Sequence, residues 1–209
     1  MSSLLLIIYL GVIFLTSLIG VIKFRYLTTP IKLVIIFLFI TFISESTATF
    51  FSFIRKNNSS VYHFYVIISF AFYSLIYFSL LKTIKLRFSF LLMPLAFFLF
   101  CFLNSFFFQK LNNFPSINIT ISNVALVAFS LIYFKYSIDK NPFDSLRKNS
   151  FFWFNTSNLI YFTIQIFIWG IMNYLIKNGI DVDPLVSFAL IISILYYFAI
   201  GKVILMDKK

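Results

Sequence analysis

Seven long apolar runs constrain this chain more than any other feature. Hydrophobic residues make up 61% of the sequence and charged residues only 11%, whereas a soluble domain carries about 25% charged residues. A helix needs about 20 apolar residues to cross the hydrocarbon core of a bilayer. We therefore predict an all-α, polytopic bundle of seven transmembrane helices that forms one domain, residues 1–209. The expected spans are at about residues 4–21, 33–54, 61–81, 88–108, 117–136, 151–176 and 185–206.

The basic residues are distributed unevenly between the two sides of this predicted bundle. Of the 17 Lys and Arg residues, 13 lie in the loops after the first, third and fifth spans and at the end of the chain, among them Lys82, Lys85 and Arg87. Positively charged loops stay in the cytosol, so we expect the amino terminus outside and the carboxyl terminus in the cytosol of a multi-pass protein of the cell inner (cytoplasmic) membrane. This pattern explains the net charge of +11 with the lipid bilayer as partner and with no nucleic acid.

Glu45 is the one acidic residue within an expected span. An ionised carboxylate near the middle of a bilayer is costly, so such a residue is usually functional or paired. Thr41 and Thr49 lie one helical turn to either side, and this stripe should face the bundle interior. Two interpretations stay open. Glu45 binds a ligand, an ion or a proton, or it is a protonated acid that hydrogen-bonds a neighbouring helix.

The sixth expected span carries a second polar and aromatic stripe. Its members recur every three or four residues and share one helical face: Asn158, Tyr161, Gln165, Trp169 and Asn173. Other spans carry further polar residues: Ser69, Tyr73, Tyr77, Asn104, Asn118, Ser122, Ser193, Tyr196 and Tyr197. We predict that the two stripes and these residues line one central cavity. The candidate ligand-binding residues are Glu45, Thr41, Thr49, Tyr73, Gln165, Trp169 and Tyr196. The alternative is ordinary hydrogen bonding between helices.

Two residues that occur once in the chain have less specific interpretations. His63 lies at the outer start of the third span, either in an interfacial aromatic belt or as a pH sensor, a role that Glu45 would share. Cys101 is expected to be a small buried apolar side chain. One histidine and one distant acid are too few ligands for a metal, so we expect no metal and no cofactor. No nucleophile–base pair is evident, so we expect a protein that is not an enzyme.

A family resemblance rests on Glu45, on residues 57–65 (NNSSVYHFY) and on residues 151–162 (FFWFNTSNLIYF). In these segments and in its seven-span plan, the chain resembles a family of seven-span membrane proteins of Bacteroidota, similar to the membrane sensor region of some histidine kinases. The resemblance implies a stand-alone sensor-like module. Because the sequence has no kinase half, we expect no phosphotransfer of its own. The resemblance implies no particular ligand.

Together these features predict an integral membrane sensor or receptor-like protein. A small ligand, a lipid or a proton would act in the cavity around Glu45, Gln165 and Tyr196. The cytosolic loops at residues 82–87 and 137–150 would then signal to a separate cytosolic or membrane partner. Two alternatives stay open: a small carrier or channel with Glu45 as its coupling site, and a structural subunit of a membrane complex.

Overall fold

The chain folds into an all-helical bundle. The structure is a computed structural model and describes residues 3–81, 88–140 and 143–208. Within these residues, seven helices are long and apolar enough to span a membrane, which confirms the expected all-α, multi-pass architecture. They are α1 (Ser3–Lys23), α2 (Thr29–Phe53), α3 (Ser59–Leu80), α4 (Ser89–Phe107), α5 (Ser116–Lys140), α7 (Ser150–Lys177) and α8 (Asp183–Met206). Two short helices, η1 (Phe24–Tyr26) and α6 (Phe143–Leu146), lie between them.

Local chemistry determines where several helices begin and end. Pro30 and Pro184 occupy the first turns of α2 and α8, where a missing N–H group costs no helical hydrogen bond. Asn149 caps α7 because its side chain accepts a hydrogen bond from the N–H group of Phe151 at 2.9 Å. Gly179 follows α7 with a φ angle of +66°, a left-handed conformation that glycine adopts at little cost.

One of the two loops expected to contact a partner is partly helical. The segment at 137–150 begins with the last turn of α5, contains α6, and buries the side chain of Leu146. It is therefore more ordered than the linker that its sequence suggests. Residues 141–142 and the whole loop at 82–87 lie outside the described residues, so the role of both loops in signalling stays a prediction.

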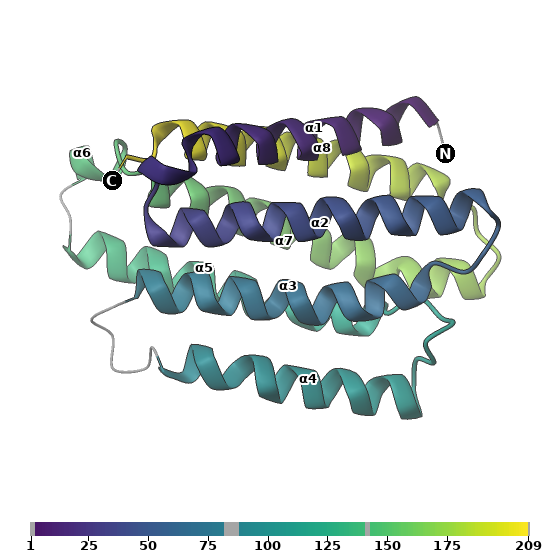
Figure 1. The fold of residues 1–209 in the computed structure, drawn as a ribbon. Helices are drawn as coiled ribbons and strands as arrows, with labels where there is room; N and C mark the ends of the chain where they lie inside the picture. Colours follow the sequence, from purple (N-terminus) through teal and green to yellow (C-terminus); the bar gives the residue numbers. More distant parts are fainter. Residues whose placement is uncertain (1–2, 82–87, 141–142, 209) are drawn as a thin grey trace.

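Six of the long helices form a closed ring, and α4 stands outside it. Around the ring, α1 packs on α2, α2 on α3, α3 on α5, α5 on α7, α7 on α8, and α8 on α1. Figure 1 shows α4 at the margin of the bundle, alongside α3. The two termini of the chain lie at opposite ends of the bundle. We call these the N-end, with the loops at 54–58, 108–115 and 178–182, and the C-end. Which end faces the cytosol stays a prediction.

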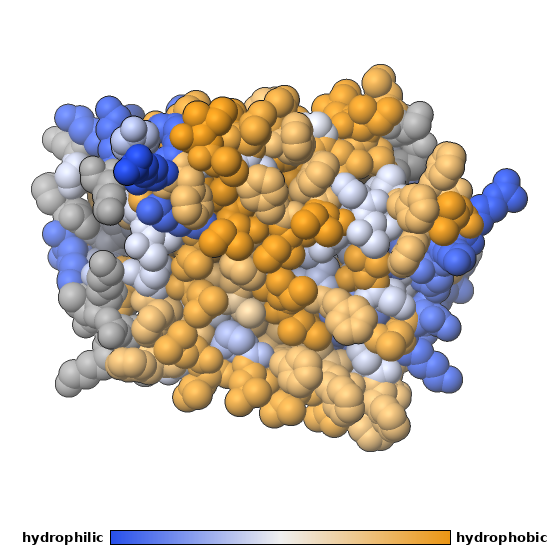
Figure 2. All heavy atoms as spheres, in the orientation of Figure 1, coloured by the Kyte–Doolittle hydropathy of each residue, from blue (hydrophilic) through white to orange (hydrophobic). Residues whose placement is uncertain are grey.

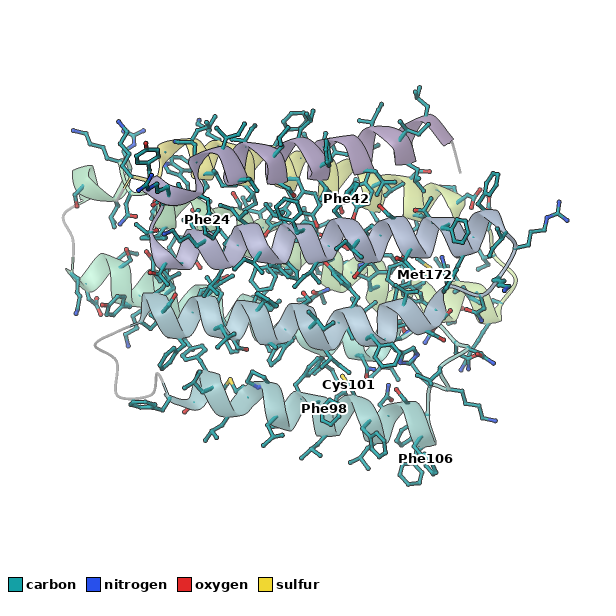
Figure 3. All side chains as sticks on the ribbon, in the orientation of Figure 1. Phe24, Phe42, Phe98, Cys101, Phe106 and Met172 are labelled. Carbon is teal, nitrogen blue, oxygen red and sulfur yellow. The ribbon has the colours of Figure 1, made fainter. Side chains whose placement is uncertain are left out.

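The outer surface of the bundle matches a lipid environment. Figure 2 shows apolar side chains over the middle of the molecule and hydrophilic ones at its two ends. Phe106 is 73% exposed and points away from the bundle, whereas Cys101 on the same helix is buried on the side that faces α3 (Figure 3). Soluble monomers rarely expose apolar patches larger than a few hundred Å². The described helices therefore fit a hydrocarbon solvent.

Aromatic packing replaces small-residue packing where α4 meets the ring. Phe97 of α4 lies 4.3 Å from Phe70 of α3 between ring centroids, and Phe90 lies 4.7 Å from Phe129 of α5 in an edge-to-face arrangement. Offset and edge-to-face pairs of this kind add about 0.5–1.5 kcal/mol each beyond their buried area. The many Phe residues of the sequence thus have a structural use at this junction.

Gly20 of α1 packs closely against Ile35 of α2, and it allows a matched test. A Cβ atom at Gly20 would lie 2.6 Å from Cγ1 of the buried Ile35, whereas one at Gly11 would meet nothing within 4 Å. We expect Gly20→Ala to destabilise the bundle by about 1–3 kcal/mol through overpacking. Gly11→Ala should be neutral or stabilising by about 0.5–1 kcal/mol because alanine favours the helix. Melting temperatures in detergent that shift equally for both variants would contradict this packing.

Candidate functional site

The ring of six helices encloses one large cavity. Its volume is about 470 Å³, within the usual range of about 300–1,000 Å³ for small-molecule sites. All six ring helices contribute side chains, and α4 contributes none. The lining runs from the N-end, where Ser52 and Ile176 are exposed, to Tyr73 and Tyr196 deep in the bundle. Met172, labelled in Figure 3, lines it from α7.

The structure brings most of the predicted site residues together at this cavity. Its lining includes Glu45, Thr49, Tyr73, Gln165, Trp169 and Tyr196. Thr41 was also expected there, and this expectation is wrong. Its side chain is fully buried, with its hydroxyl group 3.0 Å from the carbonyl oxygen of Phe37 and 3.1 Å from the hydroxyl of Tyr65. The large ring of Tyr65 lines the cavity instead, and Thr41 supports it. Whether the lining residues bind a ligand stays a prediction.

Glu45 presents a carboxyl group to the cavity with few protein partners. It lies four residues past the middle of α2, about 6 Å nearer the N-end, and so is less deep than its sequence position suggests. The hydroxyl of Tyr62 donates to Oε2 at 3.5 Å, a long and weak hydrogen bond. The hydroxyl of Tyr9 is the second group that interacts with it. An ionised carboxylate can accept about four hydrogen bonds, so much of its capacity remains for other partners.

Two buried amide atoms at the cavity lack a hydrogen-bond partner among the described residues. They are Oε1 of Gln165, on a side chain 2% exposed, and Nδ2 of Asn123, on a side chain 6% exposed. Both residues line the cavity. A buried donor or acceptor left unpaired costs about 1–3 kcal/mol, so each such group in a folded protein needs an explanation. A ligand in the cavity would supply the missing acceptor for Asn123 and the missing donor for Gln165.

A chain of hydroxyl and amide groups leads from the deep part of the cavity towards the C-end. The hydroxyl groups of Tyr73 and Tyr196 lie 2.7 Å apart, and Tyr196 donates to Oδ1 of Asn158 at 2.8 Å. Nδ2 of Asn158 then donates to the Tyr77 hydroxyl at 3.3 Å. This chain, which we call the tyrosine network, therefore joins α3, α7 and α8 directly beneath the cavity.

Tyr77 is the branch point of the tyrosine network. Besides Asn158, its hydroxyl contacts the Ser130 hydroxyl at 2.8 Å and donates to Oδ1 of Asn155 at 2.7 Å. Nδ2 of Asn155 donates to the backbone carbonyl of Ser130 at 3.0 Å. Because α5 joins the network here, a shift of Tyr73 or Tyr196 at the cavity would reach three further contacts near the C-end. Sequence analysis placed Asn158 and Tyr77 at the cavity, and the structure places them below it.

An aromatic wall closes part of the cavity at the N-end. The ring of Phe114 lies 5.5 Å from that of Tyr62 and 5.0 Å from that of Trp169, between centroids. Phe114 belongs to the loop between α4 and α5, whose conformation is held by the buried side chain of Gln109. Nε2 of Gln109 donates to the Phe114 carbonyl at 3.2 Å, and its Oε1 accepts from the N–H group of Ile117 at 3.1 Å. Sequence analysis did not single out Gln109 or Phe114.

His63 supports the same loop, and the expected place in an interfacial aromatic belt stays a prediction. Its side chain is buried and does not line the cavity. Nε2 lies 3.0 Å from the carbonyl oxygen of Asn113, and Nδ1 lies 3.0 Å from the hydroxyl of Ser105. A carbonyl only accepts, so Nε2 carries a proton and Nδ1 can accept from Ser105. His63 therefore ties α3 to α4 and to the loop, and its role as a pH sensor stays a prediction.

Asn104 and Asn118 do not reach the cavity, contrary to expectation. Nδ2 of Asn104 donates to Oδ1 of Asn118 at 2.8 Å and to Oε1 of Gln109 at 3.2 Å. Asn104 cannot reach the centre because α4 packs outside the ring, and Asn118 of α5 faces α4, where its Oδ1 accepts from Asn104. These amides make ordinary interhelical hydrogen bonds, the alternative left open from the sequence.

Asp207 has a structural role that its sequence context hides. Its neighbours Lys208 and Lys209 suggest a solvated tail, yet Asp207 is only 2% exposed. One carboxylate oxygen accepts hydrogen bonds from the N–H group and the hydroxyl of Thr28, at 2.9 and 2.8 Å, and the other accepts from the Ser150 hydroxyl at 2.9 Å. Asp207 thus joins the C-terminus of α8 to the starts of α2 and α7. We call this the Asp207 clamp.

Comparison with protein-family models, with curated proteins and with solved structures finds no match for this chain. The resemblance to seven-span sensor-like proteins therefore stays a prediction. The function has to be inferred from the geometry of the cavity and of the network beneath it.

Proposed function

We propose that this chain is a sensor-like membrane receptor that binds a small ligand inside the helix ring. The observation that carries the proposal is the pair of buried, unpartnered amide atoms of Gln165 and Asn123 at a cavity of about 470 Å³. A fold loses stability by burying such groups, and a bound ligand would recover it. The distribution of basic loops supports placement in the cytoplasmic membrane with the N-end outside.

The tyrosine network supports a route from ligand to partner. Tyr73 and Tyr196 line the cavity and are hydrogen-bonded to each other. A ligand that contacts either ring differently in two helix arrangements would shift the balance between them. The movement would pass through Asn158 and Tyr77 to the C-end half of α5 and α7. The segment at 82–87 follows α3 in the sequence, and the segment at 137–150 begins with the last turn of α5. A separate partner would bind these segments.

Gln165→Leu tests whether the unpartnered amide oxygen serves a ligand. We expect this variant to be about as stable as the natural protein, because the unsatisfied buried acceptor that it removes offsets the loss of the amide's hydrogen bond with Tyr161. Asn158→Leu is the matched control on the same helix. Both of its amide atoms are bonded, so its loss should destabilise the bundle by about 1–2 kcal/mol. Thermal unfolding in detergent measures both effects.

The binding half of this test uses the fluorescence of Trp169 at the cavity. Trp153, the other tryptophan, is exposed at the start of α7 and is removed by Trp153→Phe. Fractions of a small-molecule extract from the producing cells should change Trp169 fluorescence saturably, and Gln165→Leu should weaken that response. If Gln165→Leu destabilises the bundle as much as Asn158→Leu does and no fraction changes the fluorescence, the amide is structural and the proposal fails.

A small carrier is the second candidate, and the tyrosine network is the observation that favours it. The cavity reaches the N-end, and hydroxyl and amide groups continue from its deep part towards the C-end. In a carrier these groups would form the closed gate, with Glu45 as the coupling site. Solute or proton flux into reconstituted vesicles that exceeds the flux of empty vesicles, and that Glu45→Gln abolishes, would favour the carrier over the receptor. A structural subunit remains the third hypothesis.

A further inference from the structure

Glu45 carries the one carboxyl group among the described residues that line the cavity. No Lys, Arg or His stands opposite it there, and its two phenolic neighbours leave part of its hydrogen-bonding capacity unused. A charge buried without a partner is costly, and a paired one is much less so. A positively charged group would therefore complement the carboxylate, and no described residue of the cavity supplies that charge.

Four tyrosines that line the cavity interact with the carboxyl group. The hydroxyl of Tyr62 donates to it at 3.5 Å, and Tyr9, Tyr65 and Tyr161 interact with it electrostatically. Tyr161 is stacked on Tyr196 with centroids 4.1 Å apart, so part of this lining is fixed in place. The face of an aromatic ring carries negative electrostatic potential, and it attracts ammonium groups at distances up to about 6 Å. Rings combined with one carboxylate make a site for an organic cation and disfavour an anion.

The two unpartnered amide atoms add one hydrogen-bond acceptor and one donor to the lining. Oε1 of Gln165 accepts, so it suits the N–H group of a protonated amine. Nδ2 of Asn123 donates, so it suits a hydroxyl or carbonyl oxygen. The remaining wall is apolar, with Ile119, Val186 and Leu190 among its members. These groups together describe a compact molecule with one ammonium group, an apolar frame and a polar oxygen.

We propose that the cavity is a binding site for an organic monoammonium compound whose charge pairs with Glu45 inside the tyrosine-rich lining. This inference rests on the proposed function and specifies the ligand class. The ammonium group enters from the N-end, replaces its water shell by the carboxylate and the ring faces, and donates to Gln165. The aliphatic or aromatic part of the ligand then packs against the apolar wall, next to Tyr73 and Tyr196.

The test compares three probes that differ mainly in charge: 2-phenylethylammonium, 2-phenylethanol and phenylacetate. Each is titrated into the Trp153→Phe protein in detergent, where Trp169 is the sole tryptophan and lines the cavity. We expect 2-phenylethylammonium to change Trp169 fluorescence saturably at a concentration about tenfold lower than 2-phenylethanol, and phenylacetate to be the weakest. The Trp169→Phe protein, which keeps the distant Trp153, should not respond and thus controls for partition into detergent.

Glu45→Gln in the Trp153→Phe protein identifies the source of the preference. It should remove the tenfold advantage of the cation and leave the response to 2-phenylethanol unchanged. Equal responses to the cation and the alcohol, or a preference that survives Glu45→Gln, would overturn the cation inference while leaving ligand binding in the cavity standing. If none of the probes changes the fluorescence, the cation inference fails, and the extract titration judges the proposed function separately. Should Glu45→Gln not fold, the ranking of the three probes in the Trp153→Phe protein decides.

Discussion

Asp207→Ala is expected to destabilise the bundle by about 3 kcal/mol or more. The carboxylate accepts three hydrogen bonds at 2.8–2.9 Å from Thr28 and Ser150, and hydrogen bonds to a charged group contribute about 1.5–3 kcal/mol each. Removal leaves the N–H group of Thr28 at the start of α2 without its buried acceptor. The measurement is thermal or denaturant unfolding of the detergent-solubilised protein, followed by loss of helical circular dichroism.

Two further variants make the prediction for the Asp207 clamp specific. Asp207→Asn keeps one carbonyl acceptor but loses the other, so its destabilisation should be about half as large. Asp139→Ala removes an exposed acid in the last turn of α5, also at the C-end of the bundle. Surface substitutions usually change stability by less than about 0.5 kcal/mol. If Asp139→Ala and Asp207→Ala have equal effects, the Asp207 clamp contributes nothing and the assignment is wrong.

Lys23 reinforces the same end of the molecule. Its ammonium group donates to the carbonyl oxygens of Ile204 and Leu205 at 3.3 and 2.9 Å. These are among the last carbonyls of α8, which have no partner within the helix, and a cation there also interacts favourably with the helix dipole. The ends of α1 and α8 and the starts of α2 and α7 are therefore joined at the C-end. The cavity, in contrast, opens at the N-end.

Tyr77→Phe is expected to be the most damaging removal of a single oxygen atom in the bundle. The Tyr77 hydroxyl contacts Ser130, Asn155 and Asn158, and each of these buried groups would lose a partner. Hydrogen bonds between membrane helices contribute about 0.6–2 kcal/mol each, so the expected destabilisation is about 2–3 kcal/mol. Because α3, α5 and α7 are joined here, the response to any cavity ligand should also be weakened.

Tyr174→Phe is the matched control for this variant. Tyr174 is on α7 but is largely exposed, so loss of its hydroxyl should leave the unfolding midpoint nearly unchanged. The comparison uses thermal unfolding of both variants in the same detergent. An unfolding midpoint for Tyr77→Phe that equals that of Tyr174→Phe would show that the tyrosine network does not stabilise the bundle.

The spans were predictable because they depend on a one-dimensional property. A run of about 20 apolar residues has to be a helix in hydrocarbon, since no water is present to bond the backbone. Pro30 and Pro184 lie in the first turns of α2 and α8, where their chemistry allows them. The helical period predicted the stripe of Asn158, Tyr161, Gln165, Trp169 and Asn173. Its three middle members line the cavity, whereas Asn158 and Asn173 at its two ends do not.

Other features depended on which helices are neighbours, and no periodicity encodes that. A stripe predicts which face of a helix is polar, but not what that face meets. Asn104 lies on α4, outside the ring, and bonds Asn118 of α5, whereas His63 of α3 bonds Ser105 of α4 and so points away from the cavity. Thr41 lies on the expected stripe, but the larger Tyr65 covers it.

The sequence by itself determined that seven helices are long and apolar enough to cross a lipid bilayer, and that the carboxyl group of Glu45 lies within one of them, because both follow from local composition and from the spacing of side chains along a helix. Only the tertiary structure decided that α4 stands outside a ring of six helices and that Glu45 and Gln165 share one cavity. The tertiary structure alone also decided that Asp207 joins α8 to α2 and α7 at the C-end. These depend on contacts between residues far apart in the chain, such as Asp207 with Thr28, which exist only once the helices have packed.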